Sequence, residues 1–137
     1  QAARLGLTPV FRLNGTSDLA WEKYTCKGSD RNIFEMFDYV QFYDYTKIPN
    51  RHNIPANYHL TFSRSESNHD LAMSQIAHYN VAVVFDNVPQ TWNGQQVVDG
   101  TETDLRFLDP QGVVVGLKAN GNAKKDKSGF TVVLSAA

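Results

Sequence analysis

The chain has 137 residues, of which 42% are hydrophobic and 12% aromatic, so it is long enough to bury the core of one domain. Its formal net charge of −1 excludes a general electrostatic attraction to nucleic acids or anionic membranes. Cys26 is the only cysteine, which excludes an intrachain disulfide and a cysteine-based zinc or iron–sulfur site within this chain.

The first predicted element is the end of a helix. The stretch QAARLGLTPVFRL reads as the last turn of a helix over residues 1–5, followed directly by a strand at 8–13. Gly6 is the expected residue after the helix end, because glycine tolerates the left-handed backbone conformation found there. We therefore expect residues 1–137 to form a single domain that is the carboxyl-terminal fragment of a longer protein.

Further strand candidates follow along the chain. They are VQFYDY at 40–45, YHLTFS at 58–63, NVAVVF at 80–85, GVVVGLKA at 112–119 and a last strand at 130–134. Helix candidates lie between them, RNIFEMF at 31–37 and SESNHDLAMSQIAHY at 65–79. Strands joined by helices predict an α/β domain with a mostly parallel sheet and helical crossovers, like half of a partial β/α barrel.

Polar residues follow the predicted strands, and in a parallel sheet they would gather at one carboxyl edge. The candidate ligand-binding residues are Asn14, Asp18, Asp44, Lys47, Arg64 and Glu66. An anionic or nucleotide-like ligand is the partner that this set suggests, with the lysine and the arginine supplying positive charge. No residue is assigned a catalytic role.

Each of these residues also has a purely structural interpretation. The structural alternative for Asp44 and Lys47 is an exposed ion pair that contributes little to stability. Asn14 and Asp18 suit a helix N-cap as well as a ligand. Arg64 precedes a predicted helix and could bind an anion there, whereas Glu66 suits the acidic first turn of that helix. The sequence leaves both interpretations open.

Metal and cofactor sites are not expected. Asp99, Asp104 and Asp109 lie close together, but their spacing matches no calcium-binding loop. The four histidines show no spacing typical of metal ligands. Four lysines between 118 and 127 could touch phosphates, but no aromatic residue accompanies them, so no nucleic-acid partner is expected.

Several stretches in order resemble a known family. RLNGTSDLAWE, VQFYDYTK, NYHLTFSRSESN, NVAVVF and DGTETDLRFLDPQGVVVGLKANGNAKKDKSGF resemble the carboxyl-terminal part of an uncharacterised protein family encoded by bacteriophages and plasmids. The resemblance runs from about Leu5 to Phe130. It implies an additional amino-terminal segment with closely spaced cysteines in full-length members, and it implies no activity.

A looser resemblance concerns the order in which each predicted strand is followed by a short polar segment. LNGTSD, YDYTK and LTFSRSES look like the later strands of radical S-adenosylmethionine-type partial barrels. In that family, cysteines near the amino terminus hold an iron–sulfur cluster. This chain lacks those cysteines, so the resemblance implies no cluster on this polypeptide.

Two functions are compatible with these observations. The chain could supply the ligand-binding strand ends of a larger enzyme, or it could be a non-enzymatic module that self-associates or binds a protein partner. The second follows from the open sheet edges of half a barrel, which chains commonly cover by pairing into homo-oligomers. No stretch approaches the roughly 20 apolar residues of a membrane helix, so we expect a soluble protein in the cytoplasm of a phage host or bacterium.

Overall fold

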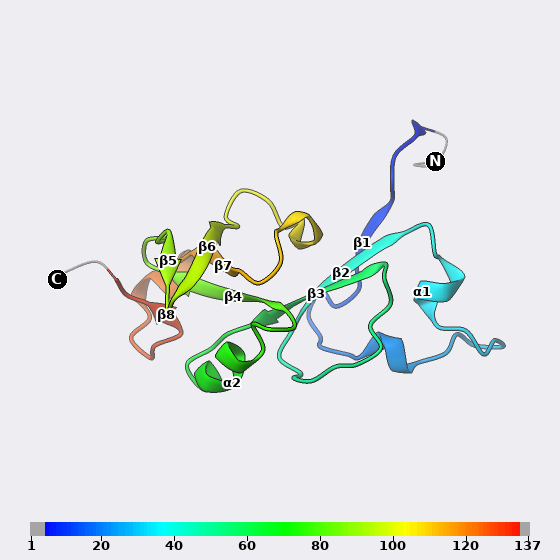
Figure 1. The fold of residues 1–137 in the computed structure, drawn as a ribbon, viewed down its shortest axis with the longest axis horizontal. Coiled ribbons are helices and arrows are strands. Elements are labelled where there is room, and N and C mark those ends of the chain that lie inside the picture. Colours follow the sequence, from blue (N-terminus) through cyan, green and yellow to red (C-terminus); the bar gives the residue numbers. More distant parts are fainter. Residues whose placement is uncertain (1–4, 135–137) are drawn as a thin grey trace. The chain divides into compact units, whose positions relative to one another are not determined.

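The computed structural model describes residues 5–134, and most of its regular secondary structure is β-strand (Figure 1). The chain divides into two compact units, Gln1–Leu60 and Thr61–Ala137. The predicted helix end at residues 1–5 falls almost entirely outside the described residues. Each unit is described by itself below.

The first unit contains a short α-helix, a 3-10 turn and the first strands. Its elements are β1 (Val10–Arg12), the 3-10 turn η2 (Trp21–Lys23), α1 (Ile33–Met36), β2 (Gln41–Thr46) and the start of β3 (Tyr58–Ser63). Helix α1 begins with a capping box, in which the Asn32 side chain accepts the N–H of Glu35 and the Glu35 side chain accepts the N–H of Asn32. These two bonds explain why the RNIFEMF segment turns helical at Ile33.

Aromatic rings form a layer in the first unit. Phe34 of α1 stacks on Tyr58 at 4.3 Å between ring centroids and packs edge-on against Phe42 at 5.1 Å. Phe11 of β1 lies 6.5 Å from Phe42. Phe34, Phe42 and Tyr58 are buried, whereas Phe11 is 57% exposed. The aromatic layer is therefore buried where it meets α1 and exposed to solvent at β1.

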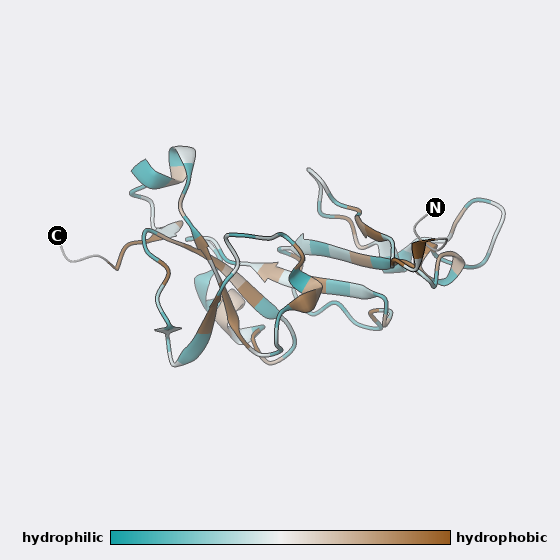
Figure 2. Ribbon diagram, turned by 90° about the horizontal axis from the view of Figure 1, so that it is seen from above, coloured by the Kyte–Doolittle hydropathy of each residue, from teal (hydrophilic) through white to brown (hydrophobic). Residues whose placement is uncertain are grey.

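The second unit holds the remaining elements. They are the end of β3, α2 (His69–Ser74), β4 (Asn80–Phe85), β5 (Thr91–Trp92), β6 (Gln95–Asp99), η3 (Arg106–Leu108), β7 (Val114–Lys118), η4 (Gly121–Lys125) and β8 (Thr131–Val132). Its core is built from the apolar strands, which carry the brown segments in Figure 2. The buried core residues are Phe62, Ala72, Val81, Val83, Phe85, Val97 and Val114.

Strand pairing produces a mixed sheet. The eight strands of the described residues are hydrogen-bonded in the order β1-β2-β3-β4-β7-β6-β5, with β8 beside β4. The β5–β6 pair is antiparallel, while β4 pairs in parallel with β3, β7 and β8. Since β3 pairs with β4 at residues 80–82 and β8 pairs with it at 84–85, β8 continues the place of β3 along the same edge of β4.

The predicted fold class is wrong. The expected α/β domain, a mostly parallel sheet with helical crossovers like half of a β/α barrel, needs a helix after each strand. Between residues 5 and 134 there are only two α-helices, of four and six residues. The connection from β2 to β3 contains no helix, and the one from β6 to β7 contains only the 3-10 turn η3. The chain therefore forms a strand-rich mixed sheet.

The long helix expected at 65–79 is reduced to α2 for a local reason. The Asn68 side chain accepts the N–H of Ser65 and donates to the carbonyl of Ser63, which holds residues 63–68 in a turn. At the other end, the Ser74 hydroxyl bonds to the carbonyl of Leu71. Side chains of this kind offer the backbone alternatives to helical bonds, so the helix is confined to six residues.

Strand β3 contains a buried hydroxyl with no hydrogen-bond partner among the described residues, that of Thr61. Replacing Thr61 with valine keeps the shape and removes this group, so we expect the second unit to gain about 1 kcal/mol of unfolding free energy. Denaturant unfolding followed by Trp92 fluorescence, in a Trp21→Phe background, measures it.

The matched control is Thr131→Val. The Thr131 hydroxyl is also buried, but it donates to the carbonyl of Ala123 at 2.8 Å, so this variant should lose about 1 kcal/mol. A loss of stability in Thr61→Val would contradict the prediction.

Candidate functional site

The predicted ligand-binding residues fall into both units. Asn14, Asp18, Asp44 and Lys47 belong to the first unit, and Arg64 and Glu66 belong to the second. Two groups of side chains are therefore described separately.

Asp44 lies inside the first unit. Its side chain is fully buried on β2, where one carboxylate oxygen accepts the N–H of Asn14 at 2.7 Å and the other accepts the Tyr58 hydroxyl at 2.5 Å. Burial raises the pKa of Asp44, and the bonds from Tyr58 and Asn14 oppose this increase. The carboxylate thus ties the turn after β1 to strands β2 and β3.

Asn14 holds the turn that follows β1. Its side-chain amide donates to the carbonyl of Leu19 at 3.0 Å, and its side-chain oxygen accepts from the Ser17 hydroxyl and from the indole N–H of Trp21. The residue is buried. Its side-chain bonds are therefore made within residues 14–21.

Asp18 and Lys47 are brought together, but through the backbone of the lysine. One Asp18 carboxylate oxygen accepts the Thr46 hydroxyl at 2.8 Å and the other accepts the N–H of Lys47 at 2.7 Å. Lys47 is exposed. These bonds hold the end of β2 in place, so the role of Asp18 in this structure is structural.

A buried ion pair in the first unit escaped the sequence analysis. The guanidinium of Arg51 binds the Glu22 carboxylate through two hydrogen bonds, and the side chains are 1% and 4% exposed. Burial alone would raise the pKa of Glu22, but the bonds and charge of Arg51 bring it below its ordinary value. These residues are 29 positions apart, so no local pattern connects them.

In the second unit, the predicted ligand-binding residue Arg64 is buried and hydrogen-bonded. It follows β3 and is only 8% exposed. Its Nη1 donates to the carbonyls of Gly129 and Phe130 at 2.7 and 2.9 Å, and its Nε donates to Nδ1 of His69 at 3.3 Å. These three bonds orient the guanidinium.

The electrostatics of Arg64 follow from this placement. Burial lowers the pKa of the guanidinium, and the negative charge of Glu66 opposes the decrease. An arginine remains charged at neutral pH in proteins. Glu66 itself is exposed and does not line the cavity beside Arg64.

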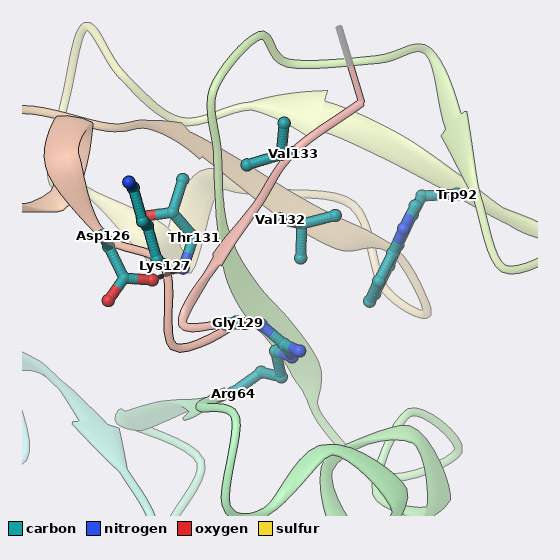
Figure 3. Close-up of a pocket in the computed structure, with 8 residues that line it drawn as sticks. All are labelled: Arg64, Trp92, Asp126, Lys127, Gly129, Thr131, Val132 and Val133. Carbon is teal, nitrogen blue, oxygen red and sulfur yellow. Dashed lines mark hydrogen bonds between the residues drawn. The ribbon is translucent and has the colours of Figure 1, made fainter. Parts of the chain in front are cut away.

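A cavity of about 360 Å³ lies next to this guanidinium (Figure 3). Arg64 and Trp92 form one side, and the guanidinium carbon lies 6.0 Å from the centre of the Trp92 ring. The segment 126–133 forms the rest. The lining residues are Arg64, Trp92, Asp126, Lys127, Gly129, Thr131, Val132 and Val133.

The segment 126–133 is shaped by Asp126. Its carboxylate accepts the Ser128 hydroxyl at 2.7 Å and the N–H of Thr131 at 3.1 Å, and these bonds lower its pKa. Lys127 adds a positive charge to the lining. The cavity therefore combines a fixed cation, an aromatic ring, two valines and one carboxylate that is already engaged.

The sequence analysis identified Arg64 but not the residues that complete its cavity. Trp92 belongs to the β5–β6 hairpin, and Val132 belongs to β8, which reaches Arg64 because it continues the place of β3 beside β4. Arg64 and Gly129 are 65 positions apart. Asn93 and Gly94, both with positive φ, form the turn between β5 and β6, but a turn of this kind does not reveal which residues the hairpin packs against.

Metal ligation finds no support in the part of the chain that is described. No group of three histidine, cysteine, aspartate or glutamate side chains within residues 5–134 is arranged to hold an ion. No helix within that range is long and apolar enough to cross a membrane.

Comparison with known proteins yields one family. The family model described as gene product 88 matches residues 1–133, nearly the whole chain. No curated protein and no solved structure matches the chain.

Proposed function

Because the chain belongs to the gene product 88 family, whose description names no activity, we propose a function from the cavity itself: the second unit binds an anionic, nucleotide-like small molecule. The observation that carries this proposal is the Arg64 guanidinium. It is buried and held by three hydrogen bonds from Nε and Nη1, so Nη2 is the guanidinium nitrogen that we expect to meet a bound anion.

The chemistry of the lining supports a ligand that is both charged and planar. A desolvated guanidinium binds phosphate or carboxylate groups strongly, and its geometry suits their oxygens. Trp92, Val132 and Val133 offer an apolar wall against which a flat ring can pack. The volume of about 360 Å³ lies within the range of about 300–1,000 Å³ common for small-molecule sites.

The proposal is limited to ligand binding. The half-barrel expected from the sequence is replaced by a mixed sheet, so the proposal is based on the cavity and not on the strand ends of a barrel. The likeness to radical S-adenosylmethionine-type barrels depended on the same architecture and is not part of the proposal.

The test is a titration of the Trp21→Phe variant, in which Trp92 is the only tryptophan. Adenosine 5′-monophosphate is the probe, with adenosine and inorganic phosphate as partial ligands. We expect the nucleotide to change Trp92 fluorescence with saturation and to bind at least about tenfold more tightly than adenosine, because a charge-assisted bond is worth about 1.5–3 kcal/mol. Equal binding of nucleotide and adenosine, or no binding at millimolar nucleotide, would overturn the proposal.

Arg64→Met in the same background should weaken binding of the nucleotide by about 10- to 100-fold. Arg31→Met is the matched control, because Arg31 is exposed and belongs to the first unit. Since Arg64 also bonds to the carbonyls of Gly129 and Phe130, thermal unfolding of each variant is measured alongside. If Arg64→Met unfolds, the comparison of nucleotide with adenosine on the unmutated cavity still decides the proposal.

A further inference from the structure

The open edge of β1 in the first unit carries exposed apolar side chains. Leu5, Leu7 and Phe11 are 67%, 60% and 57% exposed; Phe11 lies in β1, and Leu5 and Leu7 lie in the segment that leads into it. Among residues 5–134, β1 stands at the end of the strand order and pairs with β2 alone. An unprotected edge of this kind is a template for pairing with another strand.

The backbone of β1 defines which groups are available for pairing. The carbonyl of Pro9 accepts the N–H of Gln41 in β2, and Phe11 is in register with Phe42. Because successive residues of a strand direct their N–H and C=O groups to opposite sides, Pro9 and Phe11 face β2. Val10 and Arg12 then face the open edge.

We propose that the occupant of this edge is β1 of a second copy of the chain, paired antiparallel about a two-fold axis at Phe11. In this register Val10 of one copy exchanges two hydrogen bonds with Arg12 of the other, and the reverse pair does the same. Phe11 faces itself in a non-hydrogen-bonded pair, where opposing Cα atoms lie only about 4.5 Å apart.

Charge and packing favour this occupant. Arg12 is the only charged residue in 5–12, and it lies directly opposite Val10, while the two Arg12 residues are only diagonal neighbours. The Arg12 guanidinium is also held over the Tyr45 ring of its own copy at 5.0 Å. The two Phe11 rings join the aromatic layers of the two copies, each of which continues through Phe42 to Phe34. A self-complementary patch of this kind generates a closed dimer.

The test exploits the symmetry of the register, because residue 11 meets its own copy. Phe11→Glu and Phe11→Lys each place like charges face to face, so each variant alone should show a dimer dissociation constant raised by at least about tenfold. An equimolar mixture of the two variants should dimerise again, because the opposed residues then carry opposite charges. Sedimentation of the full chain from about 10 μM to 1 mM measures this.

Tyr39→Glu is the matched control, since Tyr39 is exposed in the same unit but lies outside β1, and this variant should dimerise like the unmutated chain. Trp21 fluorescence, measured in a Trp92→Phe background, reports whether the first unit remains folded in each variant. A chain that stays monomeric at 1 mM overturns the proposal. Dimers that persist in Phe11→Glu, or a mixture that does not recover, overturn it as well.

Discussion

Replacing Glu22 with alanine is expected to lower the unfolding free energy of the first unit by about 3–5 kcal/mol, the usual cost of removing one partner of a buried ion pair. Glu22 and Arg51 are almost fully buried, so the variant leaves the guanidinium inside the unit without its carboxylate. The measurement is denaturant unfolding followed by Trp21 fluorescence in a Trp92→Phe background. Trp21 is bonded to Asn14 within the same unit.

The double variant Glu22→Leu with Arg51→Met distinguishes the contribution of the ion pair from the contribution of side-chain packing at the same place. Apolar side chains of similar volume avoid the desolvation of two charges, so the double variant should recover most of the lost stability. Glu102→Ala, at an exposed position in the second unit, should change stability by less than about 0.5 kcal/mol. A loss of under about 1 kcal/mol for Glu22→Ala would show that this ion pair contributes little.

The same pair makes the first unit sensitive to acid. The pKa of Glu22 is held below its ordinary value of 4.5 by Arg51, although burial alone would raise it. A depressed pKa stabilises the folded state above the unfolded value, and this stabilisation is lost as the pH falls through the folded pKa. Glu22→Ala should therefore reduce the difference in unfolding free energy between pH 7 and pH values below 4.5.

The second large effect is expected from Gly116→Ala in β7. A Cβ atom at this position would lie 2.5 Å from Cγ1 of Val88 and 2.9 Å from Cγ1 of Val97, too close for either contact. Overpacking of a core costs about 1–3 kcal/mol, and short, branched valines cannot swing aside, so we expect a loss at the upper end. Trp92 fluorescence in a Trp21→Phe background measures unfolding of the second unit.

Two further variants test the steric cause. Val88→Ala in the Gly116→Ala background removes the closest methyl groups and should restore part of the stability, although Val88→Ala alone should destabilise the unit. Gly15→Ala has no atom within 4 Å of its new Cβ and should change stability by less than about 0.5 kcal/mol. A Gly116→Ala protein as stable as the unmutated chain would contradict the steric argument.

The sequence by itself determined where the main strands lie. The apolar runs at 58–63 and 80–85 coincide with β3 and β4, and the runs near 40–45 and 112–119 contain most of β2 and β7. Runs of β-branched and aromatic residues favour strands because their side chains fit a half-buried pleated surface. Such strands can therefore be predicted from each segment separately. Arg64, which follows β3 and borders the cavity, was identified from its position directly after this strand.

The tertiary structure alone decided how the strands connect and what each polar side chain meets. The Asp44 carboxylate accepts a hydrogen bond from Tyr58, inside the first unit. Glu22 binds Arg51, which is 29 positions away, and Arg64 binds the carbonyl of Gly129, which is 65 positions away. The energy of these contacts depends on groups that only strand pairing brings together, so no local pattern of residues contains it.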